Sequence, residues 1–170
     1  MALLEAGLAR SVVGLERRTA SLAAAALAAG ELAFRGETRD LARHQATASA
    51  DTVLLVDVLY QLDDSAQAAV LDAVAAAARA CIVIRTLDPE CGARSRLTQA
   101  LERLGRRVWP NAGNTVNAPA IAAVTERLKA RGFAVEVAPC WRGTPFANVL
   151  LVARRVSAAP LPPRPAVKAP

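Results

Sequence analysis

The sequence has few aromatic residues, few cysteines and a single histidine. Phe, Trp and Tyr make up 4% of its 170 residues, and no DNA- or RNA-reading motif accompanies its arginines. Three cysteines, Cys81, Cys91 and Cys140, show neither CxxC spacing nor a histidine-rich companion segment. This pattern argues against a zinc site and predicts reduced thiols. We therefore expect no bound metal and no nucleic-acid partner.

Long apolar runs are also missing. Glu31, Asp57 and Asp72 interrupt the richest apolar stretches, so none reaches the roughly 18 residues that cross a bilayer. The first residues do not resemble a secretory signal, because no basic segment precedes a long apolar block. We expect a soluble, cytoplasmic protein without a membrane partner.

The residues that are present predict one compact α/β domain. The chain is 54% hydrophobic, which suffices for a substantial core. Its net charge of +6 comes almost wholly from arginine in an alanine-rich chain, as codon choice in a GC-rich genome would produce. The tail over residues 157–170 is rich in Pro and Ala and is predicted to be disordered, which leaves residues 1–156 for the domain.

Strand and helix patterns alternate along the chain. The clearest strand is the near-continuous apolar run at 52–58, which only Asp57 interrupts. Asp63, Asp64 and Ser65 offer N-cap chemistry for the helix that follows. The predicted strands are residues 11–16, 32–35, 52–58, 81–85, 133–139 and 147–154. The predicted helices are residues 2–9, 19–29, 64–80, 93–108 and 119–131. The last two strands have no crossover helix between them and must pair antiparallel. The pattern predicts a Rossmann-like doubly wound sheet with a terminal antiparallel hairpin.

Several short motifs occur in the order of one known family. They are Val12-Val13-Gly14-Leu15-Glu16, Arg35-Gly36-Glu37 through Asp40-Leu41, Asp57-Val58-Leu59-Tyr60-Gln61-Leu62, Gly132-Phe133 and the ending Gly143 to Arg154. Together they resemble the class I S-adenosylmethionine-dependent methyltransferases, and the ending resembles a subgroup found with aryl-polyene and polyketide pathways. The resemblance implies methyl transfer to a small-molecule or carrier-bound acceptor, with S-adenosylmethionine as cofactor.

One part of the family pattern is missing. In the family, a first strand and a glycine-rich turn precede the strand that corresponds to residues 11–16, and this sequence contains neither. We therefore expect an N-terminally truncated fold whose sheet divides between residues 11–16 and 52–58. The open strand edges favour self-association. Cofactor binding by this chain alone is expected to be impaired, and a non-catalytic binding module is the alternative. A nicotinamide oxidoreductase is less favoured, because no dinucleotide fingerprint is present.

Three acids are the candidate cofactor ligands. By resemblance, Glu16 accepts hydrogen bonds from the cofactor ribose, and Glu37 or Asp40 lies near the adenine amino group. Glu37 is preferred because a glycine precedes it, as it often does in the family. Each of them is also explained as a solvated acid at a strand end or in a loop.

The candidate catalytic residues are Asp57 and His44. A carboxylate in an apolar strand is costly unless it is exposed or paired, so Asp57 either orients the acceptor and accepts its proton or belongs to a structural ion pair. His44 is a possible base because imidazole titrates near neutral pH, although an exposed loop histidine explains it as well. Tyr60, just beyond Asp57, is a candidate substrate-binding residue.

Three further candidates for substrate binding lie after later strands. Arg85 ends the strand predicted at 81–85 and Asp88 follows it, and a surface ion pair is their alternative explanation. Trp141, together with Trp109 and Phe146, would form apolar walls or simply pack. An arginine stripe on the helix at 93–108 is either a solvated face or a docking surface for an acidic acyl carrier protein. It consists of Arg96, Arg103 and Arg107.

Overall fold

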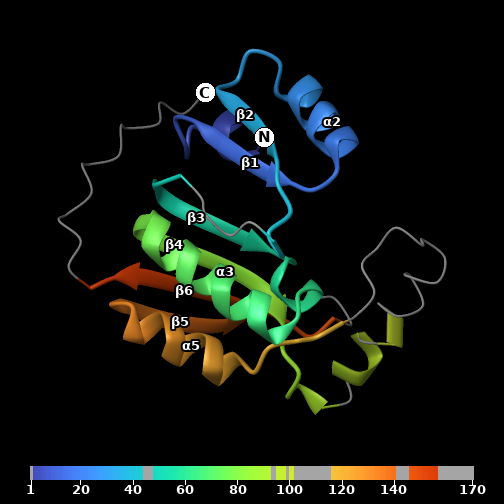
Figure 1. Ribbon diagram of the computed structural model, residues 1–170, viewed down its shortest axis with the longest axis vertical. Coiled ribbons are helices and arrows are strands. Elements are labelled where there is room, and N and C mark those ends of the chain that lie inside the picture. The colour runs from blue at the N-terminus through green and yellow to red at the C-terminus, as the bar shows by residue number, and fades with distance from the viewer. Residues whose placement is uncertain are drawn as a thin grey trace. The chain divides into compact units, whose positions relative to one another are not determined.

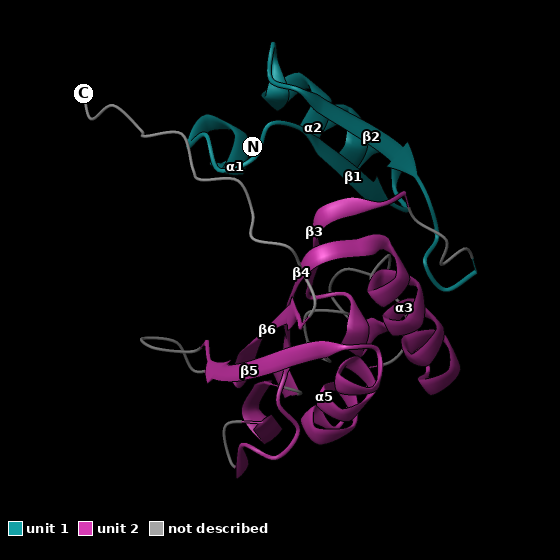
Figure 2. Ribbon diagram, turned by 90° about the vertical axis from the view of Figure 1, so that its left-hand side faces the viewer, with its two compact units in different colours: residues 1–44, 161–170 teal, residues 45–160 magenta. Residues whose placement is uncertain are grey.

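A computed structural model describes residues 2–43, 48–92, 95–98, 100–101, 116–140 and 146–156. By its contacts the chain divides into two compact units, residues 1–44 with 161–170 and residues 45–160 (Figure 2). The domain predicted over residues 1–156 thus contains two units, and each is described by itself. The tail predicted over residues 157–170 lies outside the described residues.

The first unit is a strand–helix–strand motif that follows a short helix. Helix α1 (Ala2–Glu5) precedes strand β1 (Val12–Glu16), helix α2 (Thr19–Ala29) and strand β2 (Phe34–Thr38), and the two strands pair in parallel. Alanine and leucine favour α2, which ends at Gly30 with φ of 52°. Helix α2 has the predicted bounds. The predicted strand at 32–35 is wrong by two to three residues, because pairing with β1 starts at Phe34.

Helix α2 packs closely on the two-stranded sheet because β2 carries a glycine. A Cβ atom at Gly36 would lie 2.9 Å from Leu22 Cδ2 of α2. A hydrogen atom at this position therefore allows the helix to approach the strand. Glycine inside the Arg35–Glu37 motif thus has a packing role in this structure.

The second unit contains a four-stranded sheet. Its strands are β3 (Ala50–Val56), β4 (Ala78–Leu87), β5 (Phe133–Pro139) and β6 (Asn148–Arg155). The strand order is β3-β4-β6-β5, with β3 parallel to β4 and β6 antiparallel to both β4 and β5. The terminal antiparallel hairpin is confirmed. The described strands form two sheets, β1-β2 in the first unit and β3-β4-β6-β5 in the second.

Helices cover one face of this sheet. The short 3₁₀ helix η1 (Leu59–Gln61) is followed by α3 (Asp64–Ala77), and α5 (Ile121–Ala130) precedes β5. Figure 1 shows α3 and α5 on the same side of the strands. As predicted, the Asp63 carboxylate caps α3 by accepting a hydrogen bond from the Ala66 N–H at 2.8 Å. No helix among the described residues has the length and apolar character to cross a bilayer.

Three predicted helices begin or end elsewhere. Helix α1 ends at Glu5 rather than at residue 9, where the chain already turns at Gly7 with φ of 64°. Helix α3 ends at Ala77 rather than near residue 80, because β4 already begins at Ala78. Helix α5 begins at Ile121, two residues after the predicted start at Pro119. Residues 95–98 are helical, within the helix predicted over 93–108, and most of the remainder of that range lies outside the described residues.

The core of the second unit follows from strand register. Leu55 pairs with Ile84, and Ile84 pairs with Leu151, so the three side chains share one face of the sheet. Each is at most 4% exposed. The preceding residue on β3, Leu54, points to the opposite face and is 45% exposed. The helix-covered face therefore carries the apolar core.

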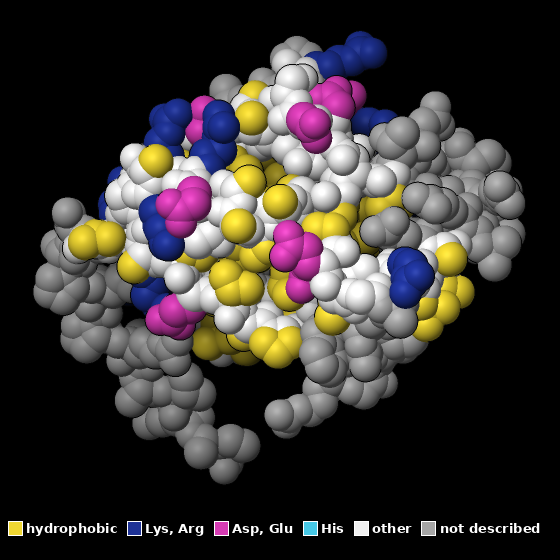
Figure 3. All heavy atoms as spheres, turned by 90° about the horizontal axis from the view of Figure 1, so that it is seen from below, with side chains coloured by type: hydrophobic (Ala, Val, Ile, Leu, Met, Phe, Trp, Pro, Cys, Tyr) yellow, Lys and Arg dark blue, Asp and Glu magenta, His cyan; other side chains and the backbone are white. Residues whose placement is uncertain are grey.

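Strands β3 and β5 form the two edges of this sheet. Val56 of β3 and Val137 of β5 are 52% and 46% exposed, so both edge strands carry solvent-exposed apolar side chains. Figure 3, seen from below Figure 1 where α5 and β5 lie, shows hydrophobic side chains at the surface between single charged groups. Exposed apolar edge strands are places where another chain can pair.

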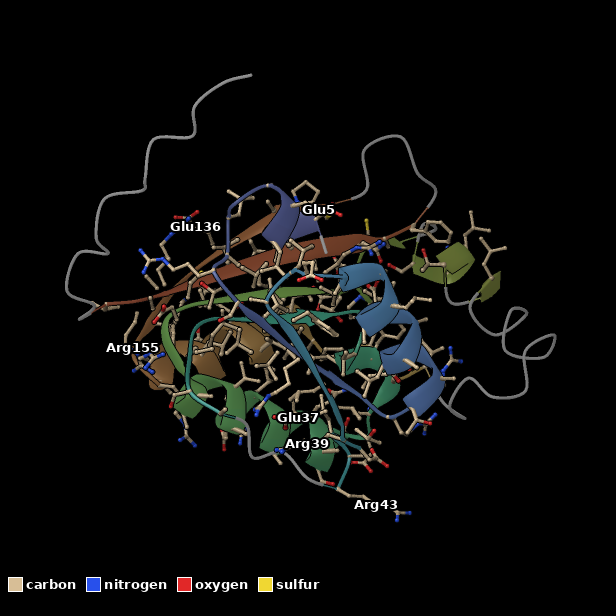
Figure 4. All side chains as sticks on the ribbon, turned by 90° about the horizontal axis from the view of Figure 1, so that it is seen from above. Glu5, Glu37, Arg39, Arg43, Glu136 and Arg155 are labelled. Carbon is tan, nitrogen blue, oxygen red and sulfur yellow. The ribbon has the colours of Figure 1, made fainter. Side chains whose placement is uncertain are left out.

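Arg155, on β6, ties the C-terminal end of α3 to the sheet (Figure 4). Its guanidinium donates to the carbonyl oxygens of Ala75 and Ala78, both at 2.8 Å, and lies 4.5 Å from the centre of the Phe133 ring. The neighbouring Arg154 makes one exposed ion pair with Glu136 at 3.4 Å. One strand end therefore presents two arginines with very different surroundings.

Candidate functional site

Asp57 lies just beyond the carboxyl end of β3. The strand ends at Val56, so the prediction that Asp57 lies within a strand over 52–58 is wrong. Asp57 instead adopts the left-handed backbone region with φ of 57°, which aspartate tolerates better than most residues. Its N–H donates to the Arg85 carbonyl oxygen at 3.0 Å. The turn directs the chain away from the sheet at the edge where α/β proteins bind ligands.

The Asp57 side chain forms an ion pair with Arg85. The Arg85 Nη1 to Asp57 Oδ2 distance is 2.6 Å, and the two side chains are 37% and 30% exposed. Partial burial raises the pKa of the Asp57 carboxyl group, and the positive charge of Arg85 opposes this rise. The sequence left a pocket acid and a structural pair as alternatives. The structure has the pair, with both groups still accessible.

The raised pKa of Asp57 predicts a pH-dependent cost to stability. Between the usual aspartate pKa and the raised value, the folded chain holds more protons than the unfolded chain, so stability falls as the pH increases through this window. Asp57→Asn removes this titration and retains a residue suited to the left-handed region. We expect the stability of Asp57→Asn relative to wild type to increase from acid to neutral pH.

Urea unfolding at a series of pH values measures this difference. Asp72→Asn is the control with the opposite sign, because hydrogen bonding and charge from Arg127 lower the pKa of Asp72. The stability that Asp72 contributes is present above the unfolded pKa and is lost as the pH falls through the folded value. A difference between Asp57→Asn and wild type that does not vary with pH would contradict the raised pKa.

The other residues predicted near Asp57 have structural contacts. Tyr60, in η1, is 6% exposed, and its carbonyl oxygen accepts a hydrogen bond from the Asn117 N–H at 2.8 Å. Asp88 follows β4, where its N–H donates to the Ala147 carbonyl oxygen at 2.7 Å and its carboxylate accepts from the Glu90 N–H at 2.8 Å. Arg85 pairs with Asp57 rather than with Asp88. Asp57 and Arg85 are therefore the polar pair at this edge.

Glu16 occupies the carboxyl end of β1 in the first unit. Its Oε1 accepts a hydrogen bond from the Arg18 N–H at 2.9 Å, and the residue is half-buried. Arg18 is the N-cap position of α2, so the Glu16 carboxylate lies near the start of a helix. This is the strand-end position that the resemblance gives to the ribose-binding acid.

Glu37 and Asp40 differ in their surroundings. Glu37 lies inside β2 and pairs with Arg35 at 2.5 Å and with Arg39 at 3.1 Å (Figure 4). Asp40 lies beyond the strand, where its carboxylate accepts a hydrogen bond from the Ala42 N–H at 3.0 Å. The strand predicted over 32–35 would leave both acids beyond its end, which is wrong for Glu37 and right for Asp40.

The register also separates Glu37 from Glu16. Glu16 is opposite Thr38, and Leu15 is opposite Glu37. Because successive side chains of a strand point to opposite faces, Glu37 points to the face away from Glu16. Glu16 and Glu37 therefore do not share a face of the two-stranded sheet.

Several predicted residues lie outside the described part of the chain. These are His44, Trp141, Trp109, Arg103 and Arg107. Arg96 is described and exposed, and Phe146 is half-exposed. Cys81, Cys91 and Cys140 are not joined in disulfides in the structure. Within the described ranges, no three His, Cys, Asp or Glu side chains are grouped so that they could hold a metal ion.

Sequence reasoning missed two residues with side-chain amides, Gln67 and Asn117, that bind the segment following Asp57. Gln67 is 6% exposed on α3, and its side chain donates to the carbonyl oxygen of Asn117 at 2.7 Å. One signal was available. Gln67 precedes Val70, Leu71 and Val74 at helical spacing, which predicts a polar group on the buried face of the helix.

Comparison with known proteins finds similarity at the level of structure. No protein-family model matches the sequence, and no curated protein matches it. Solved structures do match. Magnesium protoporphyrin IX methyltransferase from Synechocystis PCC 6803, with bound SAH, has a TM-score of 0.64 at 20% identity, over 91% of this chain and 67% of that one. The chain has the fold of S-adenosylmethionine-dependent methyltransferases.

Two other structures show the same methyltransferase fold. An S-adenosylmethionine-dependent methyltransferase from Mesorhizobium loti has a TM-score of 0.65 at 19% identity, over 86% of this chain and 81% of that one. An O-methyltransferase family protein from Burkholderia thailandensis has a TM-score of 0.67 at 19% identity, over 88% of this chain and 45% of that one. The chain thus spans between about half and four fifths of the length of these methyltransferases. The predicted Rossmann-like fold class is confirmed.

Proposed function

We propose that the protein binds S-adenosylmethionine and serves methyl transfer to a small-molecule or carrier-bound acceptor. The observation that carries this proposal is the position of its acids within a methyltransferase fold. Glu16 ends β1, and Asp57 follows β3. In open α/β sheets, ligands bind outside the carboxyl ends of the strands, which supports a ligand-binding role for each acid within its own unit.

The residues present fit part of the cofactor. The Glu16 carboxylate has two acceptor oxygens, which suit the two hydroxyl groups of a ribose. Asp40, beyond β2, is the better candidate for the adenine amino group, because Glu37 would have to give up its contacts with Arg35 and Arg39. The sequence has no glycine-rich turn after a strand, so we expect this chain alone to bind the cofactor weakly.

The chemistry at the acceptor would depend on Asp57. S-adenosylmethionine supplies an electrophilic methyl group, and the protein contributes mainly by holding the acceptor in line with it. An oxygen or nitrogen acceptor must also lose a proton. The raised pKa of Asp57 suits a proton acceptor, and Arg85 at 2.6 Å would stabilise its charged form. Arg85 and Asp88 would contact the polar end of the acceptor. His44, Tyr60 and Trp141 remain predictions from sequence.

A non-catalytic methyltransferase-like module is the second candidate. The open strand edges favour it, because Val13 of β1 is 47% exposed and Leu54 of β3 is 45% exposed. Such edges suit self-association or a protein partner. An acidic acyl carrier protein, the polyketide-pathway subgroup and a cytoplasmic location remain predictions from the sequence.

Titration with S-adenosylmethionine, followed by NMR, tests the proposal. Glu16→Gln is expected to weaken binding about tenfold, because one charge-assisted hydrogen bond contributes roughly 1.5–3 kcal/mol. Glu37→Gln is the matched control and is expected to leave the affinity unchanged. Absence of binding at millimolar cofactor would reject the proposal and favour the non-catalytic module. Equal weakening by both variants would contradict the role of Glu16.

A further inference from the structure

Asp57 has a backbone conformation that its surroundings must maintain. It is the one non-glycine residue with positive φ in the described part of the chain. Such conformations persist where neighbouring groups fix them, and they concentrate at functional sites. Both backbone polar groups of Asp57 are engaged. Its N–H donates to the Arg85 carbonyl oxygen at 3.0 Å, and its carbonyl oxygen accepts from the Gln61 side-chain amide at 2.5 Å.

The contact from Gln61 depends on η1, which is too short to be stable alone. A 3₁₀ helix of three residues has few internal hydrogen bonds, and their geometry is poor. The buried amide of Gln67 supplies external support. Its Nε2 atom lies 3.1 Å from the carbonyl oxygens of both Leu59 and Leu62, the first residue of η1 and the residue after its end. Gln67 thus holds both ends of η1.

Asn117 holds the same turn from a distant part of the chain. Its N–H donates to the Tyr60 carbonyl oxygen at 2.8 Å, and its carbonyl oxygen accepts from the Gln67 amide, 50 residues away, at 2.7 Å. Its side-chain amide donates to Asp64 Oδ1 at 2.7 Å and to the Leu62 carbonyl oxygen at 3.3 Å. Both the backbone and the side chain of Asn117 therefore bind the segment that follows Asp57.

We propose that Gln67 and Asn117 are positioning residues that hold η1, and through Gln61 hold Asp57, in the geometry that aims its carboxylate at Arg85. We refer to Gln67 and Asn117 as the amide latch. Its significance for catalysis rests on the proposed function. The latch acts through hydrogen bonds to η1 and makes no contact with the Asp57 carboxylate itself.

The test compares Gln67→Leu with wild type in the full chain. Leucine is close to glutamine in size and removes the donor to three carbonyl oxygens. We expect the Asp57 N–H to exchange with solvent at least tenfold faster than in wild type, relative to the Ile84 N–H in the core. We also expect the pKa of the Asp57 carboxyl group, followed by ¹³C NMR, to fall towards its usual value as the turn loosens and burial decreases.

Arg155→Met is the matched control for general destabilisation. Arg155 supports the opposite end of α3 through Ala75 and Ala78, so its loss should leave the Asp57 pKa and the relative exchange rate unchanged. Asn117→Ala retains the backbone hydrogen bonds of the latch and should give a smaller shift of the same sign. It also keeps the test possible if Gln67→Leu does not fold.

Two outcomes separate this inference from the proposed function. Neither readout requires cofactor. If the chain does not bind S-adenosylmethionine but Gln67→Leu still shows faster exchange and a lower pKa at Asp57, the role of the amide latch stands and the methyltransferase proposal is rejected. Unchanged Asp57 exchange and pKa in both latch variants would overturn the latch. Equal changes in the Asp57 exchange rate and pKa in Arg155→Met would show that these effects come from general destabilisation, and would also overturn the proposed role of the amide latch.

Discussion

Replacing Leu55 with alanine is expected to lower the free energy of unfolding by about 2–5 kcal/mol. Leu55 is 4% exposed and pairs with Ile84, which is fully buried beside Leu151. Truncation removes apolar contacts and leaves a cavity between the sheet and α3. A loss of this size is a large part of the roughly 5–15 kcal/mol that stabilises a typical domain. Urea unfolding followed by circular dichroism measures the change.

Leu54 provides the matched control on the same strand. It is the same residue type in the preceding position, but it points to the opposite face and is 45% exposed. Leu54→Ala is expected to cost less than about 1 kcal/mol, because little buried surface is lost. Equal losses for the two variants would mean that both faces of β3 are buried in solution, through association or another packing. The same measurement therefore reports whether the exposed face of β3 is covered in solution.

Arg155→Met is expected to destabilise the second unit by about 2 kcal/mol. Each hydrogen bond from a charged group contributes roughly 1.5–3 kcal/mol, and partial exposure of the side chain reduces the sum. Arg155 makes two such bonds, to the carbonyl oxygens of Ala75 and Ala78, and also stacks over Phe133. Methionine retains much of the apolar stem, so the change isolates the guanidinium group. Thermal and urea unfolding measure the loss.

Arg154→Met controls for the loss of one positive charge at the same strand end. Arg154 and Glu136 have side chains that are 61% and 80% exposed and 3.4 Å apart. Exposed pairs of this kind contribute roughly 0–1 kcal/mol, so we expect almost no change in stability. High salt should remove any difference between Arg154→Met and wild type. A larger loss from Arg154→Met than from Arg155→Met would contradict the assigned role of Arg155.

The fold was largely predictable where local signals were strong. Alanine and leucine followed by Gly30 gave the bounds of α2, and the short link between β5 and β6 required an antiparallel pair. Strand β2 was less predictable, because its two-stranded sheet buries little of it and Gly36 interrupts the apolar pattern. The end of β3 was also misplaced. Val58 extended the apolar run, whereas the backbone already turns at Asp57.

The sequence indicated candidate residues but not their contacts. Glu16 was chosen from its strand end and the family resemblance, and Asp57 because it interrupts an apolar strand. The partner of Asp57 depends on the register of β3 and β4, which a sequence does not state. The preference for Glu37 over Asp40 depended on the position of one strand end. Asn117 contacts η1 from more than 50 residues away, so no local pattern indicates that contact.

The position of β6 between β4 and β5 determines when this sheet can assemble during synthesis. Among the strands that the structure describes, β5 is hydrogen-bonded only to β6. A nascent chain that has emerged from the ribosome only as far as residue 147 can pair β3 with β4, but β5 has no partner and Leu151 is still missing from the core. Completion of the sheet therefore waits for the last strand, and until then the side of β4 that β6 will occupy is open to chaperones or to a neighbouring nascent chain.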